Sequence, residues 1–202
     1  MKVAAQLGVL GLGLGLLASV GCAPSSAVDD DHETDGHEPV EDQNAEVGSG
    51  TVAQATSSSC STATIRPLSQ QILDEMVCVD PTKFSRVPDL PNVVIPEGVF
   101  PYLGTAAKDA FVEAVGKKPN STLTVNSMFR TVGQQYMVRR WYLQGRCGIS
   151  AAAKPGNSNH ESGLAVDVAN YSTFQAVLES EGFDWFGSSD KPHFDYEGPG
   201  AE

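Results

Sequence analysis

The chain has 202 residues and a formal net charge of −12, with 25 acidic residues against 13 Lys and Arg. This length suits one ordinary domain with some residues to spare. The acidic balance and the lack of a basic patch argue against nucleic acid as a partner.

Residues 1–22 have the pattern of an export signal. A short charged start precedes an apolar run over residues 3–20, which ends in small residues. A membrane-spanning helix is the alternative, but the run is marginal for a span of about 20 residues and its glycines weaken a helix. Leu17–Cys22 resembles the lipobox of bacterial lipoproteins, which predicts a lipid on Cys22 that anchors an exported protein to a membrane. Ordinary cleavage a few residues later, with release of the protein, stays open.

Residues 23–58 are expected to form a disordered acidic tether. The stretch 28–58 holds nine acidic residues, no Lys or Arg, and few apolar residues. Such a segment cannot bury enough apolar surface to offset the loss of chain entropy on folding. The folded domain is therefore expected over residues 59–202.

Three cysteines follow the signal, Cys60, Cys78 and Cys147. A disulfide is expected in an exported protein, and three thiols leave one without a partner among themselves. We favour a bond between Cys78 and Cys147, because each closes a predicted helical segment. None of the three has metal-ligand spacing, so all are interpreted as structural.

Helical spacing and stop signals alternate with short β patterns in the domain. The expected helices are Ser69–Met76, Thr105–Val115, Val132–Gln144 and one that opens at Ser172 and ends before Gly182. The expected strands are Asn92–Ile95, Thr122–Asn126, Gly163–Val168 and His193–Tyr196. Phe183–Phe186 is expected to pack in the core. The order predicts a single α+β domain with a small antiparallel sheet that carries the site and is flanked by helices.

Two histidines and one carboxylate, His160, Asp167 and His193, are candidate metal ligands. A catalytic zinc commonly has three such ligands and keeps its fourth position for water. Asp190, three residues before His193, is then a candidate general base toward that water. If His160 and Asp167 bind one ion, a turn at Ser162–Gly163 must intervene, because residues seven apart in a straight strand point to opposite faces.

Arg130 lies between an expected strand and an expected helix. A guanidinium at that place offers a fixed fork toward a carboxylate or a carbonyl oxygen. The alternative is a surface arginine that pairs with the acidic tether.

These residues resemble a known family. Ser158-Asn-His160-Glu-Ser-Gly-Leu-Ala-Val-Asp167 matches the S-x-H-x-x-G-x-A-x-D signature of the zinc D-Ala-D-Ala carboxypeptidases of the VanY type, which are related to L-alanyl-D-glutamate endopeptidases and to the hedgehog and lysostaphin-type group. Asp190-Lys-Pro-His193 is similar to the second signature of that family. Ser127-Met-Phe-Arg130-Thr, with Gln135 five residues after the arginine, is similar to its S-G-Y-R-S/T element.

The resemblance implies a zinc peptidase that acts on peptidoglycan stem peptides. His160, Asp167 and His193 would bind Zn²⁺, and Asp190 would act as general base. Arg130 would bind the scissile carbonyl oxygen or the substrate carboxylate, with Ser158 and Gln135 as further candidate substrate contacts. The implied activity is a D-alanyl-D-alanine carboxypeptidase in cell-wall remodelling, located in the bacterial cell envelope, the periplasm or outside the cell, and we expect a monomer.

The sequence also departs from the family pattern. Met128 and Phe129 replace the usual Gly and Tyr, and Asp190 stands where many of these carboxypeptidases have Glu. Asp at this position is closer to the related endopeptidases, so a peptidoglycan endopeptidase of the L-Ala-D-Glu or D,D type is an alternative. A zinc-containing binding module that has lost catalysis is another, although both Asp190 and Arg130 are present.

Overall fold

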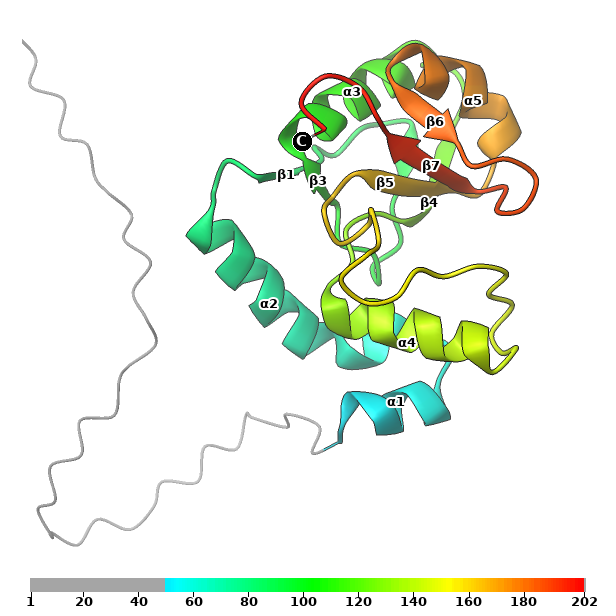
Figure 1. The fold of residues 1–202 in the computed structure, drawn as a ribbon. Coiled ribbons are helices and arrows are strands. Elements are labelled where there is room, and N and C mark those ends of the chain that lie inside the picture. Colours follow the sequence, from blue (N-terminus) through cyan, green and yellow to red (C-terminus); the bar gives the residue numbers. More distant parts are fainter. Residues whose placement is uncertain (1–49, 202) are drawn as a thin grey trace, which may run out of the picture. The chain divides into compact units, whose positions relative to one another are not determined.

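The computed structural model describes residues 50–201, which form a mixed helix and sheet domain (Figure 1). The predicted export signal, the lipid site at Cys22 and the tether as far as residue 49 lie outside the described residues. Within residues 50–201, none of the helices is both long and apolar enough to cross a membrane.

The larger sheet has five strands in the order β2-β4-β5-β7-β6. Their bounds are β2 Val93–Val94, β4 Leu123–Ser127, β5 Ala165–Val168, β6 Phe183–Trp185 and β7 His193–Tyr196. The pairs from β4 to β6 are antiparallel, and β2 joins β4 in parallel. The predicted α+β class with a small, mainly antiparallel sheet is confirmed.

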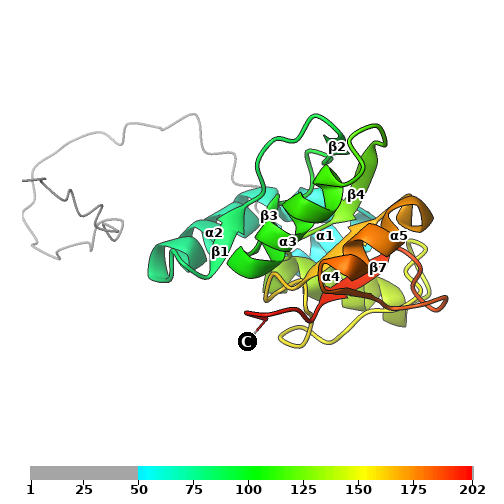
Figure 2. The same ribbon diagram turned by 90° about the horizontal axis from the view of Figure 1, so that it is seen from above.

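One face of this sheet packs against α3 (Thr105–Gly116) and α5 (Tyr171–Ser180). The two helices lie side by side over the strands, as Figure 2 shows. The core between helices and sheet includes Phe111, Phe174 and Phe194, all fully buried. Since side chains alternate along a strand, burial of this face leaves the opposite face of β5 and β7 for polar residues.

The other helices lie on the opposite side of the sheet (Figure 1). They are α1 (Val52–Ser58), the 3₁₀ turn η1 (Thr62–Ile65), α2 (Arg66–Val79) and α4 (Val132–Leu143). A second apolar cluster joins α1 and η1 to α4 around Met137 and Trp141, and the Trp141 indole N–H donates to the carbonyl of Thr56 at 2.9 Å. Helix α1 lies inside the segment expected as tether, so the ordered domain begins earlier than residue 59.

Most expected elements occur where the sequence places them, with several differences in bounds or type. Helix α2, for example, runs three residues beyond the expected Ser69–Met76 at each end. The Thr131–Gln134 capping box of α4 is present. Helix α5 begins at Tyr171, one residue before the expected Ser172, and follows Asn170, whose side chain bonds to the backbone of β4 and of the residue before it. Phe183–Trp185 is a strand. A two-stranded ribbon, β1 (Phe84–Arg86) with β3 (Tyr102–Gly104), was not expected.

The disulfide prediction was wrong. Cys147 bonds to Cys60, and their Cα atoms lie 5.4 Å apart. The chain before Cys60 lies along the end of α4, where the Arg146 guanidinium donates to the carbonyl of Ser57 at 3.2 Å. This packing of α1 on α4 brings Cys60 to Cys147, and sequence spacing gave no sign of it.

Removing this bond with a Cys60→Ala, Cys147→Ala double substitution is expected to destabilise the fold. The bond joins residues 87 apart, and in the chain-entropy account a loop of that size contributes about 4.6 kcal/mol. The expected fall in Tm is roughly 10 °C, measured by circular dichroism without added reductant. A fall of less than about 3 °C would contradict this role for the disulfide.

Candidate metal centre and active site

The pairing of β5 with β7 places Asp167 directly opposite His193. Side chains alternate between the two faces along β7. Phe194 and Tyr196 face the core, so His193 and Asp195 lie on the other face, which also carries Asp167. The carboxylate and the imidazole therefore meet because of strand register, with Asp167 Oδ1 2.9 Å from His193 Nδ1.

His160 reaches the same point from the loop that precedes β5. The chain turns at Gly163, which has φ +73°, and a Cβ there would lie 2.5 Å from the backbone nitrogen of Gly104. Only glycine fits so close an approach in that conformation. The turn required for His160 and Asp167 to meet is thus present, and His160 Nε2 lies 3.3 Å from Asp167 Oδ1.

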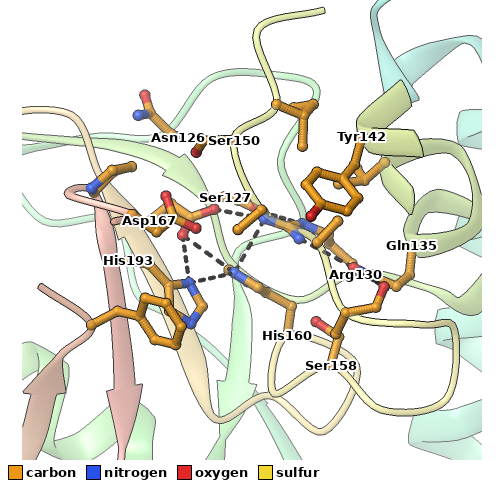
Figure 3. Close-up of a pocket in the computed structure, with 18 of the residues that line it drawn as sticks. Asn126, Ser127, Arg130, Gln135, Tyr142, Ser150, Ser158, His160, Asp167 and His193 are labelled. Atoms are coloured by element: carbon orange, nitrogen blue, oxygen red, sulfur yellow. Dashed lines mark hydrogen bonds and ion pairs between the residues drawn. The ribbon is translucent and has the colours of Figure 1, made fainter. Parts of the chain in front are cut away.

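Three potential ligand atoms form a compact triangle (Figure 3). Its sides are 3.3 Å from His160 Nε2 to Asp167 Oδ1, 2.9 Å from Asp167 Oδ1 to His193 Nδ1, and 3.3 Å between the two imidazole nitrogens. In tetrahedral zinc sites with bonds of about 2.0–2.1 Å, ligand atoms lie about 3.3 Å apart. The donor set and its spacing therefore fit a zinc ion with one position left for water or substrate.

Each imidazole has a partner for the nitrogen that faces away from this triangle. His160 Nδ1 lies 2.7 Å from the carbonyl oxygen of Met128, which can only accept, so His160 carries its proton there and presents a lone pair at Nε2. His193 Nε2 lies 2.9 Å from Asp195 Oδ1. Such outer partners orient metal-binding histidines in proteins.

Arg130 lies beside the triangle, and contacts through all three of its guanidinium nitrogens hold it there (Figure 3). Nη2 donates to Asp167 Oδ2 at 2.6 Å and lies 3.1 Å from His160 Nε2. Nε donates to Ser127 Oγ at 2.7 Å, and Nη1 donates to Gln135 Oε1 at 3.1 Å. The described residues thus use four of its five N–H donors. The Arg130 side chain is only 16 % exposed and its guanidinium pairs with Asp167, so it is not a solvated surface arginine.

The two further candidates for substrate contact occupy different environments. Gln135 is fully buried, and its amide bridges Arg130 to the carbonyl of Ala153, to which Nε2 donates at 3.0 Å. Ser158 lines the cavity described below, and its hydroxyl has no hydrogen-bond partner among the described residues. Ser158 is therefore available to a ligand, whereas Gln135 holds Arg130 in place.

Asp190 lies in the loop between β6 and β7. The loop is closed by the indole N–H of Trp185, which donates to the carbonyl of Lys191 at 2.8 Å, and by the backbone N–H of His193, which donates to the carbonyl of Asp190 at 3.0 Å. The Asp190 carboxylate accepts no hydrogen bond from residues 50–201. Asp190 thus places a carboxylate near the three candidate metal ligands without being one of them.

One cavity of about 1120 Å³ contains all these groups. Its lining includes the three candidate ligands, Asp190 and the segment Gly148–Ala153. Phe186 also lines the cavity, with 52 % of its surface exposed and its ring 5.4 Å from that of His193, edge to face. The expectation that Phe186 packs in the core is thus not met. An exposed aromatic ring there offers an apolar contact to a ligand.

Burial and neighbouring charges shift the pKa values of the cluster. Burial lowers the pKa of His160, and the Arg130 guanidinium lowers it further. Burial acts to raise the pKa of Asp167, but His160 and Arg130 outweigh it and hold this pKa well below its usual range. Burial and Asp167 raise the pKa of Asp190.

His193 has the opposite behaviour to His160. Burial acts to lower its pKa, but hydrogen bonds to Asp167 and Asp195 outweigh this and raise the pKa to about 10. Without a metal, His193 is therefore protonated at neutral pH, and a metal that binds Nδ1 must displace that proton. His160 Nε2 and Asp167 already present lone pairs.

Two residues of the site were not found by sequence reasoning, Asp195 and Asn159. Asp195 follows His193 by two positions on a strand, and this spacing puts both side chains on one face. That signal was available in the sequence. Asn159 contacts Asp195 from a distant loop, and no local pattern marks it.

Comparison with known proteins finds similarity among solved structures. No family model matches the chain, and no curated protein matches it. Among solved structures, the chain is similar to the LdcB LD-carboxypeptidase, whose structure is described as showing the molecular basis of peptidoglycan recognition. The identity is 22 %, the TM-score is 0.44, and the match covers 60 % of this chain and 71 % of that one.

Proposed function

We propose that the protein is a zinc-dependent D-alanyl-D-alanine carboxypeptidase that hydrolyses peptidoglycan stem peptides in cell-wall remodelling. The observation that carries the proposal is the triangle of His160, Asp167 and His193, with Asp190 in the same cavity. The substrate class rests on the resemblance of these residues to the signatures of the zinc carboxypeptidases.

The roles follow from the contacts. His160, Asp167 and His193 hold the zinc, which when bound lowers the pKa of a water to about 7 and polarises a carbonyl group. Asp190 accepts a proton from the attacking water and returns it to the leaving amine. Its raised pKa suits this exchange, because an acid that binds a proton more readily is a better base.

Arg130 stabilises the negative charge that grows on the scissile carbonyl oxygen. One N–H on Nη1 is unused by the described residues. The N–H of Nη2 that faces His160 Nε2 also becomes available when that nitrogen binds a metal instead. Ser158 supplies a hydroxyl to the substrate backbone, and Gln135 keeps Arg130 in position.

The proposal extends to the location of the protein. Peptidoglycan lies outside the cytoplasmic membrane, so the export signal and a lipid at Cys22 would deliver a monomeric enzyme to its substrate. The tether would let an anchored domain reach the wall around it.

The endopeptidase alternative is favoured by the charges in the cavity. A carboxypeptidase must hold a free carboxylate. Once His193 gives up its proton to bind a metal, the only cationic side chains that line the cavity, among the described residues, are Arg130, whose donors are largely used, and Lys191. An endopeptidase needs no such cation. The presence of Asp190 where many carboxypeptidases have Glu points the same way.

Digestion of purified peptidoglycan with the zinc-loaded protein tests the proposal. Soluble products are identified by mass spectrometry. Loss of one terminal alanine from pentapeptide stems is the expected result. Cleavage within the stem or at a crosslink would replace the carboxypeptidase by the endopeptidase. No cleavage by a folded, zinc-loaded protein would contradict the enzyme proposal and favour the binding module.

A further inference from the structure

Asn159 and Asp195 form a hydrogen-bonded chain behind one of the candidate ligands. Asn159 Nδ2 donates to Asp195 Oδ1 at 2.9 Å, and the same oxygen lies 2.9 Å from His193 Nε2. His193 Nδ1, on the other side of the ring, belongs to the ligand triangle. The chain therefore joins the loop that carries His160 to the strand that carries His193.

The environment restrains Asp195 in one orientation. Its side chain is 18 % exposed, and the Asn159 amide and the His193 imidazole approach the same carboxylate oxygen. An ionised carboxylate can only accept hydrogen bonds, so the contact between Asp195 and His193 requires a hydrogen on His193 Nε2. Neutral His193 must then present its lone pair at Nδ1, toward the triangle.

We propose that Asn159 and Asp195 are positioning residues that set the tautomer and the ring orientation of His193 and thereby raise the affinity of the site for zinc. The negative charge of Asp195 also makes the imidazole a stronger donor to a cation. The inference rests on the metal site of the proposed function. It adds Asp195, which lies outside the family signatures quoted above, and Asn159, which occupies a variable position of the first signature.

The sheet gives independent support for a role of Asp195 outside folding. Asp195 stands directly opposite Asp184 in the β6–β7 pair. Like charges at directly opposed positions destabilise a sheet. A residue that served only the fold would relieve this repulsion, whereas a carboxylate that orients a metal ligand has a reason to remain.

Equilibrium zinc affinity of the purified protein, measured by competition with a chromophoric chelator, tests the proposal without reference to catalysis. Asp195→Ala is expected to weaken zinc binding about 10–100-fold. Asp195→Asn should recover part of this loss, because its amide oxygen can accept the same N–H without the charge. Asn159→Ala should weaken binding by roughly several-fold. Asp184→Asn is the matched control, since it removes a charge from the opposed position without contact to His193, and its affinity should equal that of the unaltered protein.

The outcomes separate this inference from the proposed function. Circular dichroism establishes whether each variant is folded. If Asp195→Ala does not fold, the zinc affinity of Asp195→Asn is used to test the proposal. Unchanged zinc affinity in folded Asp195 variants overturns the positioning role and leaves the metal site standing. An unaltered protein that binds no zinc overturns both. If Asp184→Asn and Asp195→Asn lose zinc affinity equally, the loss comes from the change in net charge near the site and not from orientation of His193. That result would also overturn the inference.

Discussion

Replacing Asp190 by alanine is expected to lower kcat for stem-peptide hydrolysis by about 10²–10⁴-fold, the usual contribution of a general base. Asp190 lines the cavity that holds the metal triangle, and its carboxylate has no partner among the described residues. Its loss therefore removes a proton acceptor without breaking a structural contact. Zinc affinity should change little, because the three ligands stay in place.

A fall in kcat without a fall in zinc affinity distinguishes loss of the general base from loss of the metal site. Asp184→Ala is a suitable control, since Asp184 is an exposed acid on the adjacent strand β6 and lies outside the cavity lining. Its kcat should match that of the unaltered protein. An Asp190→Ala variant that retains full kcat would require another base and would remove Asp190 from the mechanism.

Replacing Arg130 by alanine is expected to have two large effects. Loss of a donor to the developing oxyanion should lower kcat by about 10²–10³-fold. The substitution also leaves the Asp167 carboxylate, which is only 14 % exposed, without its guanidinium partner. Leaving a buried charge without any partner costs about 3–5 kcal/mol. Because protonated His193 still pairs with Asp167, we expect part of this cost, and the metal-free variant should unfold at a lower temperature.

Zinc should reverse part of that stability loss, because a bound cation neutralises Asp167 in place of the arginine. Thermal unfolding with and without zinc measures this, and the shift produced by zinc should be larger in Arg130→Ala than in the unaltered protein. Arg140→Ala, on the exposed side of α4, is the control and should change neither quantity. An Arg130→Ala variant with normal stability and kcat would show that the contacts to Asp167 carry no energy.

Local sequence patterns predicted most of the elements that position the site. The capping box at Thr131 sets the start of α4, and the glycine at 163 supplies the turn that lets His160 approach Asp167. The alternation around Asp167 placed its aliphatic neighbours in the core and the carboxylate on the other face. These features depend on residues close together in the chain, which is why the sequence indicates them.

The geometry of contacts between distant segments was beyond the sequence, although residue types and the family resemblance had already grouped His160, Asp167 and His193 as one site. The opposition of Asp167 and His193 depends on the β5–β7 register, and the link from Asn159 to Asp195 depends on a loop that meets that sheet. The bond between Cys60 and Cys147 likewise depends on how α1 packs against α4. The burial of Gln135 likewise depends on a distant segment, since its amide on α4 donates to the carbonyl of Ala153, 18 residues further along the chain.

A stoichiometric zinc titration of the metal-free protein tests the central claim most directly. Zinc is added in fractions of an equivalent, and the rate of release of stem-peptide fragments is measured after each addition. The rate should be near zero at the start, rise in proportion to zinc and stop rising at one equivalent per chain, and a His193→Ala variant should stay inactive throughout. Hydrolysis by the metal-free protein, or a rate independent of zinc, would contradict a zinc-dependent peptidase at this site.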